Sequence, residues 1–330
     1  MILALETSCD DTCAAVLDGA GAVRSSVVSS QGVHERFGGV VPEIASRHHL
    51  ELLDAVVADA LARAGAGLEQ IERVAVTQGP GLIGALLVGL CAGKAIAAAR
   101  GLPLTPVDHL HGHVAASFLA DPDLRPPFVV LIASGGHSFI ARVAGHGPGH
   151  EVLGSTLDDA AGEAFDKGAR MLGLGYPGGA ALERLAREGD AGAFAFPAAA
   201  GVSGLDMSFA GVKTALRYAI RDLGEREAER RRADLAASYQ AAIVAQLTER
   251  VRRALEATGM ERLALGGGVA ANGPLREAAR ALVPDVVVPA PELCTDNAAM
   301  IGAAARDLPA IPFPGYLALD AYASGERGPG

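Results

Sequence analysis

The chain has no tryptophan, aromatic residues make up 4% of it, and it contains only four cysteines, three lysines and two asparagines. None of the cysteines forms a CxxC pair, and a chain of 330 residues can bury a large core without disulfides. We therefore expect a reducing, cytoplasmic compartment. The sequence also lacks a basic segment followed by an apolar run at its start, so no secretory signal is predicted.

Long apolar runs are scarce as well. The longest, residues 82–99, contains Lys94 and several glycines and is shorter than the roughly 20 residues that a membrane span needs. It predicts a buried helix and no membrane association.

The formal net charge of -10 argues against a chain that binds nucleic acid unaided, because phosphate neutralisation requires basic surface. A local exception is the arginine run at residues 226 and 230–232, which we interpret as a solvated helix face. The 28 basic residues comprise 25 arginines and three lysines. Because arginine is the usual cation of this chain, the lysines at positions 167 and 213 suggest sites that require a compact point charge.

Strand and helix patterns occur twice in the same order. The first series has β-like runs at 2–7, 13–17, 23–29, 73–77 and 104–108, with helical patterns at 42–64, 82–100 and 109–119. The second has β-like runs at 128–133, 138–143, 151–155, 262–265 and 286–289, with helical patterns at 159–172, 180–188, 225–258, 273–282 and 296–306. This duplication predicts an α/β fold of two ribonuclease-H-like domains, the two-lobed actin-like (ASKHA) plan, with the ligand in the interlobe cleft.

A linker rich in Pro and Asp at residues 121–127 sets the expected boundary between the lobes. We expect an N-terminal lobe at 1–122 and a C-terminal lobe at 123–330, with a helical insertion at about 159–258. The helix at 296–307 is free to pack back on the first lobe.

A metal site is predicted where the first series ends. His109 and His113 are four residues apart at the start of a helix, so their imidazoles share one face. Asp296, near the end of the second series, supplies a carboxylate. Two histidines and one carboxylate with open positions suit iron or zinc. The HExxH protease motif is excluded because Leu110 stands where its glutamate would be.

Glycine-rich turns follow several predicted strands. The turns at 134–138 and 266–272, the latter opening a helix, let backbone N–H groups face an anion, and the segments 6–12 and 176–179 are of the same type. Four such turns at matching strand ends predict a nucleotide-like ligand.

Together these segments resemble the TsaD family of tRNA N6-adenosine threonylcarbamoyltransferases. The resemblance extends from residue 1 to about residue 307 and is carried by nine motifs: ETSCDDT (6–12), GVVPEIASRH (39–48), GPGL (79–82), HLHGH (109–113), SGGH (134–137), DDAAGEAFDK (158–167), YPGG (176–179), GGGVAAN (266–272) and TDN (295–297).

The resemblance implies roles for individual residues. His109, His113 and Asp296 match the family's metal ligands, which implies one divalent ion per chain, Fe²⁺ or alternatively Zn²⁺. The adenylate contacts implied are Ile132, Ala133, Ser134, Gly135, Gly136, Asp166, Gly179 and Asn272. Glu183 stands where the family often has Asp, and His111 where it often has Glu. Asp11 is our candidate for a charge acting near the reacting group.

The implied reaction transfers the threonylcarbamoyl group of threonylcarbamoyl-AMP, made by a separate adenylate-forming enzyme, to N6 of adenosine 37 in tRNAs that read ANN codons, releasing AMP. Given the acidic charge, we expect weak tRNA binding without helpers. The implied helpers are a TsaB-like paralogue and a TsaE-like ATPase. Two alternatives share the fold: an actin-like small-molecule kinase and a non-catalytic ATP-binding partner protein.

Overall fold

The computed structural model describes residues 1–147, 149–175, 177–198 and 201–323; Tyr176 of the YPGG motif and the tail at 324–330 lie outside them. The chain forms two compact units. Unit 1 comprises residues 1–123, 146–147 and 295–323 of the described chain, and unit 2 comprises residues 124–145 and 149–294.

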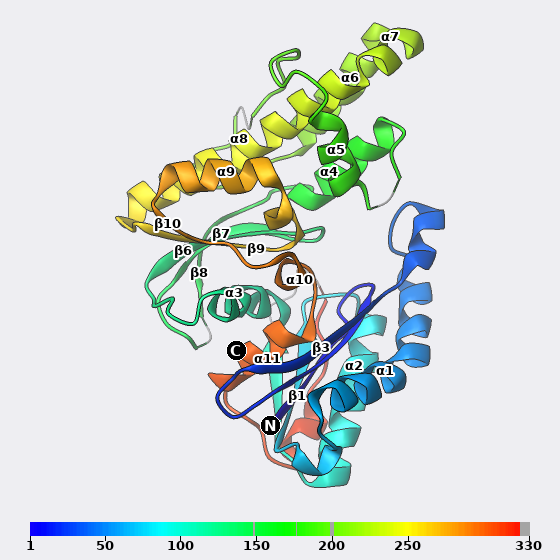
Figure 1. Cartoon of the computed structure of the whole chain (residues 1–330), viewed down its shortest axis with the longest axis vertical. Helices are drawn as coiled ribbons and strands as arrows, with labels where there is room; N and C mark the ends of the chain where they lie inside the picture. The colour runs from blue at the N-terminus through cyan, green and yellow to red at the C-terminus, as the bar shows by residue number, and fades with distance from the viewer. Residues whose placement is uncertain (148, 176, 199–200, 324–330) are drawn as a thin grey trace. The chain divides into compact units, whose positions relative to one another are not determined.

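Unit 1 contains a mixed five-stranded sheet with helices packed on it (Figure 1). Its strand order is β3-β2-β1-β4-β5. Its strands are β1 (Ile2–Glu6), β2 (Asp11–Leu17), β3 (Val23–Ser30), β4 (Arg73–Gly79) and β5 (Leu104–Asp108). Its helices are α1 (Pro42–Ala64), α2 (Ile83–Arg100), α3 (His109–Ala120) and α11 (Ala298–Arg306), with short 3₁₀ helices at Gly32–Phe37, Leu68–Gln70 and Gly315–Ala318. The central strand β1 pairs antiparallel with β2 and parallel with β4, and both of its faces are buried.

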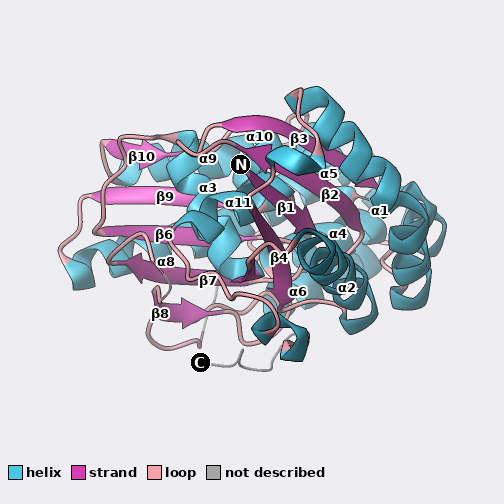
Figure 2. Ribbon diagram, turned by 90° about the horizontal axis from the view of Figure 1, so that it is seen from below, coloured by secondary structure: helices cyan, strands magenta, loops and turns pink. Residues whose placement is uncertain are grey.

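Unit 2 repeats this order as β8-β7-β6-β9-β10, and Figure 2 shows the five strands side by side. The strands are β6 (Phe128–Ala133), β7 (Ser138–Val143), β8 (Glu151–Ser155), β9 (Arg262–Gly266) and β10 (Asp285–Val287). The helices are α4 (Ala161–Met171), α5 (Gly178–Ala186), α6 (Ala210–Leu223), α7 (Glu225–Arg230), α8 (Arg232–Thr258), α9 (Gly273–Leu282) and α10 (Pro291–Cys294), with a 3₁₀ helix at Gly268–Ala271. The identical strand order in both units confirms the predicted duplication.

Two helical predictions need correction. Helix α6 was not predicted, although it lies inside the expected helical insertion, because Gly211 and the β-branched Val212 and Thr214 weaken the helical signal of its first turn. The region expected as one helix from 225 to 258 is divided into α7 and α8 around Arg231.

Helix α2 is partly exposed rather than fully buried. Leu86, Leu90 and Ala97 are buried where α2 packs on β4 and α1, whereas Ile83 and Leu87 are exposed. By length and composition alone α2 could cross a membrane, with a third of it buried, but one such helix is weak evidence because core helices of soluble proteins pass the same test.

Helix α11 belongs to unit 1, although the sequence placed it at the end of the second series. It is buried from Ala298 to Ala305 and packs against β1, β2 and α3. Small residues permit this approach: a Cβ on Gly302 would lie 2.2 Å from Leu17 Cδ1, and one on Gly112 would lie 2.8 Å from Ile301 Cδ1. The packing brings the segment before α11 to the start of α3.

Candidate metal centre

Helix α3 presents two buried imidazoles from its first turns. Asp108 caps the helix, since its Oδ1 accepts a hydrogen bond from the backbone N–H of His111 at 3.0 Å. His109 and His113 therefore follow at i and i+4 on one face, with ring centroids 4.7 Å apart and an interplanar angle of 81°. Both rings are buried, at 5% and 1% exposure.

Asp296 reaches the same point from the turn before α11. Asn297 fixes that turn, because its Oδ1 accepts from Met300 N at 2.9 Å and its Nδ2 donates to Thr295 O at 2.8 Å. Asp296 Oδ1 lies 3.5 Å from His109 Nε2 and 3.2 Å from His113 Nε2. The three ligand atoms all lie within 4.8 Å of one another, so the predicted triad is brought together, entirely within unit 1.

A buried carboxylate orients His109 from behind. Glu6 ends the apolar strand β1 with no exposed surface, and its Oε2 lies 3.0 Å from His109 Nδ1, with Ser8 Oγ at 3.2 Å from the same nitrogen. Glu6 also accepts hydrogen bonds from Thr77 Oγ1 and from Ser8 N. A carboxylate at Nδ1 leaves Nε2 of His109 directed at the triad, which is the usual support of a metal-binding imidazole.

The donor set fits a divalent ion. Within the described residues neither ring nitrogen of His113 has a hydrogen-bond partner, although Nε2 faces Asp296, and such buried polar atoms are costly unless something binds them. Two imidazoles and a carboxylate, with one imidazole hydrogen-bonded to a second carboxylate, are a donor set that suits a divalent metal ion. His111, which stands where the family often has Glu, is buried at 5% exposure and does not belong to the triad.

In the metal-free protein His109 carries a proton at neutral pH. Burial alone lowers the pKa of His109, but the carboxylates of Glu6 and Asp296 outweigh it and raise that pKa to about 9. The same ion pair lowers the pKa of Glu6 against the effect of its own burial.

Metal binding should therefore release a proton. We expect the affinity of the chelator-treated chain for Co²⁺ to rise by about tenfold per pH unit between pH 7 and 9, because the ion must displace the proton of His109, and to level off above pH 9. Titration calorimetry in buffers of different ionisation enthalpy measures both the affinity and the proton release. An affinity independent of pH in this window would contradict a protonated His109.

Asp11 is the first residue of β2, directly after the turn that follows β1, and it lies outside the triad. Burial raises the pKa of Asp11 to about 7, helped by Asp296 and Asp10 and opposed by a hydrogen bond with Ser30. Sequence reasoning missed the residue that holds this turn. His49, buried on α1, places Nε2 3.0 Å from Cys9 O and Nδ1 2.8 Å from Thr12 Oγ1. It directly follows the 39–48 motif, and a histidine on the buried face of α1 was the available signal.

In unit 2 the predicted adenylate loops lie at the carboxyl ends of adjacent strands. Ile132 and Ala133 are buried at the end of β6, and the turn after them closes with a hydrogen bond from Ser134 N to His137 O at 2.7 Å. Ile132 pairs with Gly266 at the end of β9. Gly267 has a φ of 82°, and a Cβ there would lie 2.4 Å from Ala133 O, so only glycine lets the two loops approach. Gly135, Gly136 and Gly268 face open space.

The remaining predicted contacts are linked through helix α5. Asp166 Oδ1 accepts a hydrogen bond from Gly178 N at 2.7 Å. Burial raises the pKa of Asp166, although the N–H groups of Gly178 and Gly179 act to lower it. Asn272 Nδ2 donates to Glu183 Oε2 at 3.2 Å and to Gln240 Oε1 at 2.9 Å, while its Oδ1 caps α9 at Leu275 N. Asp166 therefore binds the first residue of α5, and Glu183 lies on the same short helix, where Asn272 holds its carboxylate.

The two lysines of unit 2 converge on one carboxylate. Asp159 accepts from Lys167 at 2.8 Å and from Lys213, and the two cations lower its pKa against burial. Because Lys167 lies on α4 and Lys213 on α6, their shared ion pairs with Asp159 link the two helices. The arginine run behaves as a solvated face: Arg230, Arg231 and Arg232 each form an ion pair with an acid three residues away.

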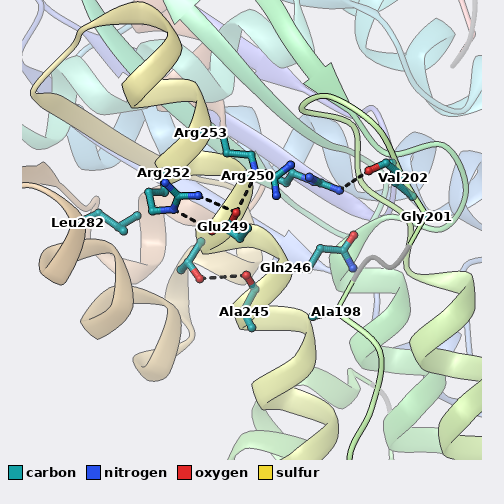
Figure 3. A pocket seen from close by; sticks show the side chains of 11 residues that line it. Ala198, Gly201, Val202, Ala245, Gln246, Glu249, Arg250, Arg252, Arg253 and Leu282 are labelled. Carbon is teal, nitrogen blue, oxygen red and sulfur yellow. Dashed lines mark hydrogen bonds and ion pairs between the residues drawn. The ribbon is translucent and has the colours of Figure 1, made fainter.

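Unit 2 also has a hollow of about 590 Å³ (Figure 3). Arg252 and Arg253 beside it are paired with Glu249, and Arg250 donates to Val202 O and Gly204 O. Its walls include residues between 245 and 253 in the second half of α8, and Leu282 at the end of α9. These two helices lead to the amino ends of β9 and β10. The glycine loops follow the carboxyl ends of the strands, so this hollow is separate from the predicted ligand loops.

Structural similarity agrees with the fold. HypF of T. kodakarensis has a TM-score of 0.61 at 16% identity, covering 98% of this chain and 48% of that one. Component A of the (R)-2-hydroxyglutaryl-CoA dehydratase of Acidaminococcus fermentans has a TM-score of 0.58 at 12% identity, covering 93% and 96%. At these identities the likeness shows the fold alone, and it confirms the actin-like class.

Sequence similarity is much higher to curated transferases. The chain is 52% identical to the tRNA N6-adenosine threonylcarbamoyltransferase of Symbiobacterium thermophilum, covering 92% of this chain and 90% of that protein. It is 53% identical to the enzyme of the same name from Anaeromyxobacter dehalogenans, covering 92% of each. The family model for TsaD, tRNA N6-adenosine threonylcarbamoyltransferase, matches residues 22–303. With its histidine–aspartate group and strand-end loops, the chain therefore belongs to the TsaD family of tRNA N6-adenosine threonylcarbamoyltransferases.

Proposed function

We propose that this protein transfers the threonylcarbamoyl group of threonylcarbamoyl-AMP to N6 of adenosine 37 in tRNAs that read ANN codons and releases AMP. The observation that carries the proposal is the convergence of His109, His113 and Asp296 in a chain about half identical to named transferases along 92% of its length. The bond formed joins the carbamoyl carbon to N6. The bond broken joins that carbon to the phosphate oxygen, and the N6 proton passes to a base.

The cofactor we propose is one divalent ion per chain, Fe²⁺ or alternatively Zn²⁺, held by His109, His113 and Asp296. Such an ion supplies Lewis-acid polarisation of substrate oxygens. The protein's own contribution is to keep Nε2 of both imidazoles and Oδ1 of Asp296 converged, with Glu6 fixing the orientation of His109.

The adenylate is proposed to bind unit 2 at the strand-end loops. Ile132 and Ala133 end a rigid buried strand, and Ser134, Gly135 and Gly136 continue it with backbone N–H groups available as preorganised donors. Asp166 and Glu183 are proposed to accept hydrogen bonds from the ribose hydroxyls, with Gly179 and Asn272 beside them. The support is geometric: the Asp166 carboxylate accepts a hydrogen bond from Gly178 N at the start of α5, and the Glu183 carboxylate, on α5 itself, accepts one from Asn272 Nδ2.

Asp11 is proposed as a charge that acts near the reacting group. A carboxyl group whose pKa is about 7 can exchange protons near neutral pH, as a general base must. Its pKa is raised by burial and by the neighbouring carboxylates, among them Asp296 of the triad.

The partners proposed are tRNA, a TsaB-like paralogue and a TsaE-like ATPase, with a separate enzyme supplying the adenylate in the cytoplasm. The net charge of -10 supports a need for helpers, because a basic surface must come from elsewhere to hold tRNA. Among the described arginines of the 230–232 run, each already pairs with an acid.

One reaction mixture tests the function: the full chain with threonine, bicarbonate, ATP, the adenylate-forming enzyme, both helper proteins and tRNA. We expect the mass of a threonylcarbamoyl group on adenosine 37 and one AMP released per modification. ATP consumption with a small-molecule acceptor instead would favour the kinase. If adenosine 37 is modified to the same extent when this chain is left out, the chain is not the transferase, and the proposal is refuted in favour of a non-catalytic binding partner.

A further inference from the structure

The described residues after α11 run along unit 1 and reach the start of α3. Ile311 pairs with Leu104 on β5 through hydrogen bonds of 3.0 and 2.8 Å, and Tyr316 is fully buried. Lys94 Nζ on α2 donates to Leu317 O at 3.3 Å and also to Leu319 O. We refer to residues 308–323 as the strap. These contacts hold it along unit 1 and lead its last residues to the carboxyl ends of β4 and β5.

At that end the strap is fastened to β4 by Gln78. The amide Nε2 of Gln78 donates to Asp320 O at 2.7 Å, and its backbone O accepts from Tyr322 N at 3.2 Å. The next residue, Gly79, begins the GPGL motif, whose first glycine still lacks a role. A Cβ on Gly79 would lie 2.4 Å from Tyr322 O and 2.8 Å from its ring, and φ is 157°. Glycine is needed here because Tyr322 occupies the space of a side chain.

Tyr322 contacts Asp108, the N-cap residue of α3. Its hydroxyl donates to Asp108 Oδ2 at 2.6 Å, and Tyr322 is 8% exposed. The other oxygen of Asp108 accepts the N–H of His111 and caps α3. A single carboxylate therefore joins the strap to the helix that carries both imidazoles, one residue before His109.

We propose that Tyr322 is a positioning residue for the metal centre, acting through Asp108 to fix the first turn of α3. The inference rests on the proposed metal site and deepens it. With the hydroxyl in place, Asp108 has one orientation, so the N-cap, the helix axis and the spacing of His109 and His113 from Asp296 are set together. Without it, Asp108 can rotate and the first turn of α3 loosens, while the strap keeps its backbone contacts.

The test is Co²⁺ titration of chelator-treated full-length protein, followed by visible absorption and by calorimetry. Tyr322→Phe should lower the Co²⁺ affinity by roughly three- to tenfold and alter the absorption band. This loss is smaller than that expected when a residue that hydrogen-bonds a metal ligand directly is removed. Tyr218→Phe is the matched control and should bind as the native chain does, because Tyr218 is half exposed on α6 and its ring contacts Arg221. Equal affinity for native and Tyr322→Phe protein would overturn the proposal.

A second pair of variants tests the route through Asp108. Asp108→Ala should weaken binding on its own, and adding Tyr322→Phe to it should cause no further loss, since the partner is already absent. Independent, additive losses would show that Tyr322 does not act through Asp108. If the native chain binds Co²⁺ no better than His113→Ala, the metal centre itself is wrong and the proposal falls with it. If the native chain binds Co²⁺ more tightly than His113→Ala but no more tightly than Tyr322→Phe, only the positioning role of Tyr322 is refuted.

Discussion

His113→Ala should abolish threonylcarbamoyl transfer and leave the fold intact. The substitution removes one of three converged ligands, so the loss of metal affinity should exceed the roughly 10- to 100-fold that an outer partner costs. The metal-free protein should lose little stability, because the cavity left by the ring is offset by removal of buried nitrogens that have no hydrogen-bond partner among the described residues. Co²⁺ titration, circular dichroism and the tRNA mass assay measure the three quantities.

His48→Ala is the control for that variant, because His48 is a partly exposed histidine on α1 whose contact with Glu51, at 3.7 Å, is weak. It should bind Co²⁺ as the native chain does. Full transfer activity by metal-depleted His113→Ala protein would show that the triad is not part of the reaction.

Glu6→Gln should weaken the metal centre without touching a ligand directly. The amide keeps the shape of Glu6 but removes the charge that orients His109 and strengthens its nitrogen as a donor. We expect a loss of about 10- to 100-fold in Co²⁺ affinity at pH 9. The loss should be smaller at pH 7, because the native site must also displace the proton of His109, whose pKa is about 9, whereas the variant has little proton to displace.

The distinguishing result is the pH profile. The native affinity should rise from pH 7 to 9, and the affinity of Glu6→Gln should be nearly flat across the same window. Glu51→Gln, an exposed carboxylate on α1, should keep the native slope. A Glu6→Gln variant with the native slope would mean that Glu6 does not control the protonation of His109.

Much of the fold follows from local pattern. The strands β5, β6, β7 and β8 and helices α1 and α9 begin and end at the residues that periodicity predicted. Their signals are strong because apolar runs alternate with clear stops, such as Pro42 opening α1. The pattern failed at α6, where a glycine and β-branched residues hide a helix that tertiary packing stabilises.

The candidate site was predictable only in part. The spacing of His109 and His113 is a local property of one helix, and the glycine turns at strand ends are local too. Glu6 received no role from the sequence, because a single acidic residue after an apolar strand gives no sign of the ring it will contact 103 residues later. Nothing in the sequence indicated a role for Tyr322 either, because its partner Asp108 lies 214 residues away in the chain.

By itself, the sequence determined the duplicated α/β plan and the family, and it named the three candidate ligands, because these depend on periodicity, motif and residue type. Only the tertiary structure decided that Asp296 belongs to the same unit as the histidines. The reason is the buried, small-residue surface of α11, which can be covered only by packing on β1, β2 and α3 and so carries the preceding carboxylate to the imidazoles.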